Sequence, residues 1–200
     1  MSAVRRVVPA IALSALLASG LAGCDTLGFG VGSPVARAPV AARALDYRND
    51  DLASLVFAID LPTSFRPVPS GTVVTFDATN ASAAKHFKAT LVLADGEAID
   101  GALPPPAAGR TYFLLGFSDK DKAVLRAAQQ WVRALPPDAA PVTALHIAPR
   151  LCAAGQVDPA AAEVSVVPAL PDGPALTPIV AEPVATLLAE TGGSLQPCAS

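Results

Sequence analysis

Prolines are spread along almost the whole chain, and this feature narrows the possible folds more than any other. The 200 residues include 20 prolines, and only 16% of the residues are charged. Proline removes a backbone hydrogen-bond donor and breaks the interior of a helix, so such a chain favours short elements joined by loops over a bundle of long helices. Because 52% of the residues are hydrophobic, disorder is disfavoured. We therefore expect a loop-rich protein dominated by β-structure.

Short apolar runs separated by turn residues predict the strands. Residues 86–93 alternate between polar and apolar side chains, which is typical of a half-buried strand. Pro168 suggests that a strand near it lies at the edge of its sheet. The pattern predicts an antiparallel β-sandwich, immunoglobulin-like or similar, with a small barrel as the alternative. The other expected strands span residues 54–61, 72–78, 111–117, 144–149 and 163–170.

Two helices are expected within this β-rich domain. The first is amphipathic and spans residues 119–135, capped by Ser118 and ended by Pro136-Pro137. The second is short and spans residues 184–190, between Pro183 and Gly192. The spacing assigns the apolar face of the first helix to Val124, Ala128, Trp131, Val132 and Leu135. It assigns the polar face to Lys122, Arg126, Gln129, Gln130 and Arg133, a cationic face that is either solvated or receives an acidic partner.

The N-terminus has the pattern of an export signal. Arg5 and Arg6 precede an apolar run over residues 7–21, which is typical of a secretory signal and too short for a transmembrane helix. Leu21-Ala22-Gly23-Cys24 follows, and it resembles the lipobox of bacterial lipoproteins. The resemblance implies cleavage before Cys24, a diacylglycerol thioether on the Cys24 sulfur, and an acyl chain such as palmitate on the new amino group.

This resemblance implies a three-part organisation. Residues 1–23 are the signal peptide, residues 24–44 are a lipid-anchored flexible linker rich in glycine, proline and alanine, and residues 45–200 are a single β-rich domain. The expected location is the cell envelope, on a membrane facing the periplasm or the exterior. Asp25 resembles the signal that retains lipoproteins in the inner membrane. Residues 45–200 themselves resemble no characterised family.

The other two cysteines, Cys152 and Cys198, form an even pair once Cys24 is assigned to the lipid. In an oxidising compartment such a pair predicts a disulfide, and in the chain-entropy model a loop of this length is stabilised by about 4 kcal/mol. Two reduced, unconnected thiols are the alternative.

Catalytic, cofactor and metal motifs are not evident in the sequence. His86 and His146 each fall within an expected strand, where a structural role is the simpler interpretation. Asp50-Asp51 and Asp119 with Asp121 are better explained by turns and helix caps than by calcium binding. The formal net charge of −3 opposes binding to nucleic acid.

Two functions of different classes are compatible with these observations. The first is a non-catalytic envelope module that presents loops or a sheet edge to a protein partner. The alternative is an envelope hydrolase acting on glycan or peptidoglycan, for which two carboxylates must converge to within about 5 to 10 Å. Its candidate acids are Asp46, Asp60, Asp77, Asp95, Glu97 and Asp100.

Overall fold

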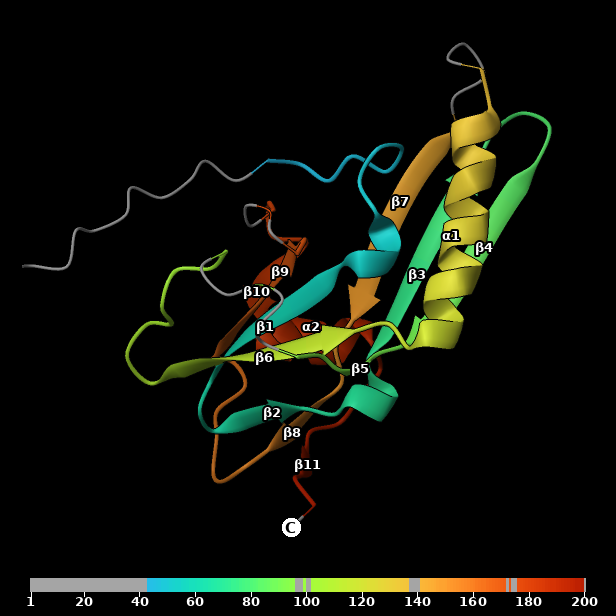
Figure 1. Ribbon diagram of the computed structural model, residues 1–200. Coiled ribbons are helices and arrows are strands. Elements are labelled where there is room, and N and C mark those ends of the chain that lie inside the picture. The colour runs from blue at the N-terminus through green and yellow to red at the C-terminus, as the bar shows by residue number, and fades with distance from the viewer. Residues whose placement is uncertain are drawn as a thin grey trace, which may run out of the picture. The chain divides into compact units, whose positions relative to one another are not determined.

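A five-stranded sheet, which we call the first sheet, lies at the centre of the fold in the computed structural model (Figure 1). It is fully antiparallel, and β1 (Val56–Pro62) pairs with a neighbour on each side. The strand order is β10 (Val180–Pro183), β9 (Glu163–Ala169), β1, β6 (Arg110–Gly116) and β5 (Val92–Leu93). The structure describes residues 43–95, 99, 102–136, 141–171, 173 and 176–199, so the predictions made for Cys24 and the signal peptide lie outside the described residues.

The second sheet is a three-stranded antiparallel sheet that continues into a smaller one. Its strand order is β4 (Ala84–Thr90), β3 (Val73–Thr79) and β7 (Val142–Ala148). A short helical turn (Pro69–Gly71) separates β3 from the smaller sheet. Next to this turn, the Val68 N–H donates to the Arg150 carbonyl at 2.7 Å and connects the two sheets. Beyond this turn the smaller sheet consists of β2 (Phe65–Pro67), β8 (Leu151–Ala153) and β11 (Gln196–Pro197).

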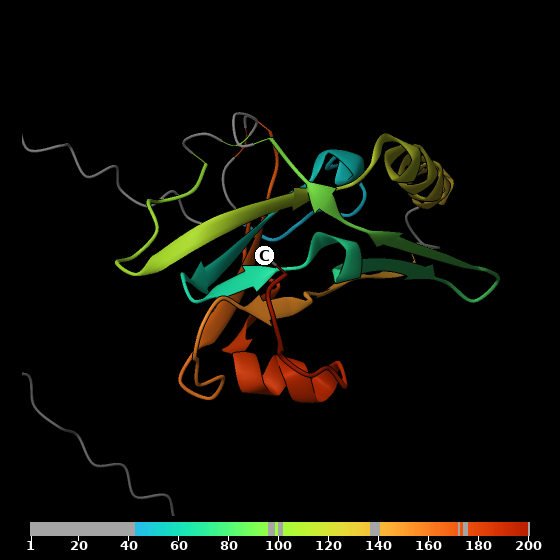
Figure 2. The ribbon, with the colours of Figure 1, turned by 90° about the horizontal axis from the view of Figure 1, so that it is seen from below.

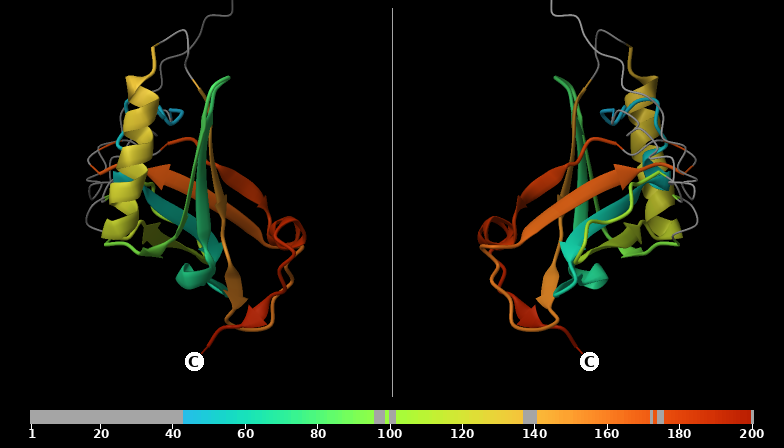
Figure 3. Two further views of the ribbon diagram at one scale, coloured as in Figure 1. Left: turned by 90° about the vertical axis from the view of Figure 1, so that its right-hand side faces the viewer. Right: turned by 90° about the vertical axis from the view of Figure 1, so that its left-hand side faces the viewer.

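The two sheets are joined along one side and separate along the other. On the joined side, β4 leaves the second sheet and continues through Leu91 as β5 of the first sheet. The Leu91 N–H donates to the carbonyl of Thr72, a fully buried residue whose hydroxyl donates to Val68 and accepts from the Arg150 N–H. On the other side lie β7 and β10, the last strands of their sheets, with helix α2 nearby, seen end-on in Figure 3. The sandwich is therefore closed by the chain on one side only.

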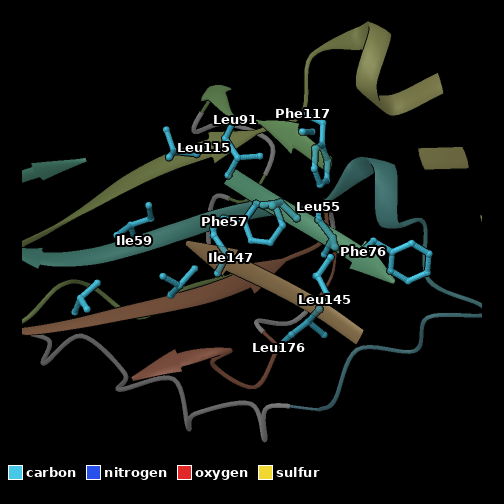
Figure 4. Packing of buried hydrophobic residues seen from close by; sticks show 14 of the residues in the cluster. Leu55, Phe57, Ile59, Phe76, Leu91, Leu115, Phe117, Leu145, Ile147 and Leu176 are labelled. Atoms are coloured by element: carbon cyan, nitrogen blue, oxygen red, sulfur yellow. The ribbon is translucent and has the colours of Figure 1, made fainter. Parts of the chain in front are cut away.

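Apolar side chains from both sheets fill the space between them (Figure 4). The Phe117 ring contacts Phe57 and Phe87 edge-to-face, with centroids 5.6 and 5.9 Å apart. Leu145 and Ile147 of β7 belong to the same cluster. Within the described part of the chain, every buried side-chain nitrogen and oxygen has a hydrogen-bond partner.

Both helices occur where the sequence predicts them, on opposite sides of the sheets (Figure 2). The Ser118 hydroxyl caps α1 (Asp119–Ala134) by accepting from the Asp121 N–H at 3.2 Å. Helix α2 (Val184–Glu190) begins directly after Pro183. In the residues that the structure describes, no helix has the length and apolar character needed to cross a membrane.

The predicted apolar face of α1 is partly wrong. Val124 is 51% exposed, whereas Leu125 and Gln129 are buried. The buried stripe passes one residue further along the helix and includes Gln129, whose carboxamide donates to the backbone carbonyls of Tyr47 and Asp50. A polar side chain thus occupies a core position by satisfying backbone groups.

The six predicted strands are all present, with boundaries shifted by one or two residues or, for residues 86–93, divided between β4 and β5. The prediction that Pro168 marks an edge strand is wrong for β9 as a whole, which pairs with both β1 and β10. Proline has no N–H to donate to a neighbouring strand. In agreement with this, β10 pairs only with Glu163 to Val166 and its pairing does not reach Pro168. The predicted disulfide between Cys152 and Cys198 is confirmed and ties β11 to β8.

Candidate binding groove

Strand β7 is a long sheet edge that lacks the usual protection against pairing. Edge strands commonly carry charged residues or proline, or are very short, which prevents them from pairing with other chains. The opposite edge, β4, carries Lys85 and Lys88, and β10 has only four residues, with Glu182 and Pro183 among them. In contrast, the seven residues of β7 include no proline and no Asp, Glu, Lys or Arg. Among the described strands, none pairs with its outer edge.

A groove of about 460 Å³ runs between β7 and β10. Residues 145–148 form one wall, residues 179–182 form the other, and Leu187 and Glu190 of α2 lie between them. At Ala148 and Thr191 the groove meets a second depression of about 470 Å³, which continues along Arg150 and Leu151. Because an extended chain rises about 3.3 Å per residue, residues 145–151, which run from β7 to the start of β8, span at most about 20 Å. The combined groove therefore has the length of a short β-strand.

The interior side of the groove is apolar. Leu145 and Ile147 point toward the core and are only 7% and 8% exposed, and Leu187 is 3% exposed. In the register of β10 with β9, Val180 is opposite Val166 and Glu182 is opposite Val164. Since Val164 and Val166 are fully buried and paired residues share a sheet face, Glu182 lies on the interior side of its strand. A carboxylate therefore sits at the mouth of an apolar groove.

Glu182 and Glu190 give the groove a negative charge. Partial burial of the Glu182 carboxylate, followed by repulsion from Glu190, raises the pKa of Glu182 above its ordinary value. Among the described residues, neither carboxylate forms an ion pair with a cation. The two side chains thus carry like charges that repel each other, and a cationic group there would be attracted by both.

The two histidines lie on the outer face of the second sheet, on the strands that flank β3. His86 Nδ1 lies 2.6 Å from Oδ1 of Asp77, its cross-strand neighbour. His146 is on the other side of β3, opposite Thr75. His86 is exposed, as the sequence predicts, whereas His146 is exposed and not partly buried as its place between Leu145 and Ile147 suggests. The structure therefore places them on one face without bringing them into one site.

The carboxylates proposed for the hydrolase alternative occupy different elements. Asp46 accepts from the backbone N–H groups of Arg48 and Asn49 in a turn, Asp60 binds Arg110 at 2.9 Å within the first sheet, and Asp77 binds His86 on the second. Asp95 follows β5, and Glu97 and Asp100 lie outside the described residues. In the described ranges, no group of three or more His, Cys, Asp or Glu residues is close enough to hold a metal ion.

Two arginines of α1, Arg126 and Arg133, contact the segment of residues 43–51, which we call the N-terminal clasp. Arg133 donates to the Arg48 carbonyl at 2.6 Å, and Arg126 lies 3.4 Å from Asp51. Arg48 donates in turn to the carbonyls at the end of α1. The clasp includes Arg43 and Ala44, which fall within the predicted linker. The cationic face of α1 is thus used largely to hold the clasp.

The clasp also lowers the pKa of its acids. The Asp50 carboxylate accepts two hydrogen bonds from Arg43, at 2.6 and 2.7 Å, and this ion pair lowers the pKa of Asp50. Hydrogen bonds from Asn49 and from the backbone lower the pKa of Asp46. For Asp51, burial acts to raise the pKa, but the combined hydrogen bonds from Ser54, Arg126 and Ala53 lower it. All three groups are thus stabilised as carboxylates by hydrogen bonds within the turn and the cap.

A further depression, of about 450 Å³, lies at the joined side of the sandwich. It is bordered by Val92 and Leu93 of β5, which are 43% and 73% exposed, and by the first turn of α1. Its strand edge is two residues long, which is too short for an extended partner to pair with. The groove along β7 is therefore the better candidate binding site.

Sequence reasoning did not identify this groove because β10 was not among the predicted strands. One signal was present, since residues 142–148 form a strand without the charges or proline that protect an edge. Comparison with protein-family models, curated proteins and solved structures found no match to this chain.

Proposed function

We propose that this protein is a lipid-anchored, non-catalytic binding module of the cell envelope that holds an extended segment of a partner protein. The observation that carries the proposal is the unprotected seven-residue edge of β7, whose residues 145–148 line a groove that continues along residues 149–151. An extended peptide that adds to a sheet edge gains affinity from main-chain hydrogen bonds and specificity from alternate side chains.

The anchor in this proposal is the lipid on Cys24. A single acyl chain binds a membrane only marginally, whereas two or more hold a protein stably. Such an anchor would keep the groove near the membrane surface and raise its local concentration toward envelope partners. The partner is a protein of the same compartment.

Photo-crosslinking in intact cells tests the use of the β7 edge. A photoreactive amino acid replaces His146 in one variant and Lys88 in the other, because these residues face solvent on the two opposite edges of the sheet, each across from Thr75. We expect a defined protein adduct from position 146 and none from position 88. Equal labelling at both positions, or no adduct from position 146, contradicts the proposal.

Intact-mass analysis of protein extracted from the native membrane tests the anchor. We expect a chain that starts at Cys24, carries added acyl mass, and releases two thiols only after reduction. The variant Cys24→Ser should lose the acyl mass and leave the membrane fraction. An unlipidated wild-type chain that keeps residues 1–23 would show that the anchor has been assigned wrongly.

A further inference from the structure

We infer that the segment held by this groove carries a lysine or arginine, which enters the mouth of the groove between Glu182 and Glu190 while its backbone adds to β7. This inference rests on the proposed function and names the chemistry of the partner. It combines the free strand edge, the apolar interior wall and the two carboxylates that no described cation neutralises.

The edge of β7 sets the backbone geometry of the occupant. In an antiparallel pair, every second residue of an edge strand points its N–H and C=O away from the sheet. Strand β7 has seven residues, and β3 pairs with all of them on the other side. An occupant of about six or seven residues can therefore form a full ladder with β7, and its part beside residues 145–148 would lie along the groove.

The wall of the groove sets the side chains that face inward. Leu145 and Ile147 face the core side of β7, and Leu187 of α2 lies across from them. Cross-strand neighbours on one face lie about 5 Å apart, so inward side chains of the occupant would meet this apolar surface. The occupant should accordingly alternate, with apolar or long aliphatic side chains at every second position.

The carboxylates select a cation among such side chains. Glu182 lies on the interior side of β10, and Glu190 is at the end of α2. The aliphatic stem of a lysine or arginine can cover apolar surface while its charged end reaches water or a carboxylate. A cation at this place removes the repulsion between the two glutamates, whereas an acidic side chain increases it.

A second copy of this chain is a poorer occupant. Pairing of two β7 edges would bring Val142 to Ala148 of the other copy into the groove, and this segment contains no lysine or arginine. The charge of Glu182 discourages another strand from pairing with β10. It does not protect the edge of β7, which lies in the other sheet. The charge pattern therefore favours a different, cationic protein segment.

Selection from a displayed library of random heptapeptides tests the inference on the full-length mature protein in detergent micelles. Affinities of synthetic copies of the selected peptides are then measured by fluorescence anisotropy for the wild type, Glu182→Gln, Glu190→Gln and the control Glu163→Gln. Glu163 is a matched control because it is an exposed carboxylate one strand away, opposite Pro183 on the outer face of the same sheet.

We expect the selected peptides to share a lysine or arginine flanked by alternating apolar residues. Each groove variant should weaken binding about fivefold, as expected for one partly exposed ion pair, and the control should not change it. Added salt should weaken binding further. In the selected peptides, every second backbone N–H would face β7. Methylation of this set of peptide nitrogens should abolish binding, because it removes the donors to β7.

The two proposals fail differently. One outcome is that the selected peptides need their backbone N–H groups but carry no lysine or arginine, and bind Glu190→Gln with the same affinity as the wild type. In that case the groove holds a strand, and the inferred selection of a cation is wrong. If no peptide is selected, or if selected peptides bind equally after N-methylation at either set of alternate positions, strand addition at β7 is wrong and the inference falls with it.

Discussion

Gln129 shows how one polar side chain can control a local fold. It is 1% exposed, and its carboxamide donates to the carbonyls of Tyr47 and Asp50 in the clasp. Replacing it with leucine should lower the free energy of unfolding by about 2 kcal/mol, because two carbonyls lose their donor. Urea denaturation measures this change. The exposed neighbour Gln130→Leu is the control, and an equal loss for both variants would contradict the role of Gln129.

Asp50 should make the clasp sensitive to acid. Its pKa is lowered from 3.8 in the folded protein, so its pairing with Arg43 contributes stability above the unfolded pKa and loses it as pH falls through the folded value. The difference in unfolding free energy between wild type and Asp50→Asn should therefore be largest at pH 5 and above, and should shrink as the pH falls below about 3.8. Urea titrations across this range test it. The control is Asp158→Asn: it keeps a side-chain oxygen that can accept from the Ala160 N–H and removes no ion pair among the described residues, so it should lack this pattern.

At the scale of elements, the disulfide has a clear expected role. It holds the two-residue strand β11 against β8, and its cysteines are separated by 46 positions. The double variant Cys152→Ala with Cys198→Ala should be less stable by up to about 4 kcal/mol, because the unfolded chain regains the entropy of a closed loop. Thermal unfolding with and without reductant measures this effect. Reductant should lower the midpoint of the wild type and leave that of the double variant unchanged.

The elements that sequence predicts are those whose pattern is long or clearly bounded. Helix α2 matches its predicted range because Pro183 and Gly192 mark its ends, and the alternation of residues 86–93 identifies β4. Strands β2, β8, β10 and β11 have two to four residues each, which is too few for a periodic signal. The groove depends on β10 and on strand order, and strand order arises from pairing between residues distant in the sequence. For this reason β7 was predicted as a strand, but its position at an open edge was not.

At the scale of the whole molecule, the joined and open sides of the sandwich should differ in local stability. Strand β1 is buried and paired on both sides, so its amides should exchange hydrogen only at the rate of global unfolding. The outward-facing amides of β7 lack a ladder partner among the described strands and should exchange much faster. If a cationic peptide adds to this edge, those β7 amides should become protected while the amides of β4 keep their rates. Hydrogen exchange with mass spectrometry, with and without a selected peptide, measures both strands at once. Pairing of the peptide with β7 supplies hydrogen-bond acceptors to the amides of β7 and not to those of β4. Equal protection of both strands would therefore show that the peptide does not bind by pairing with β7.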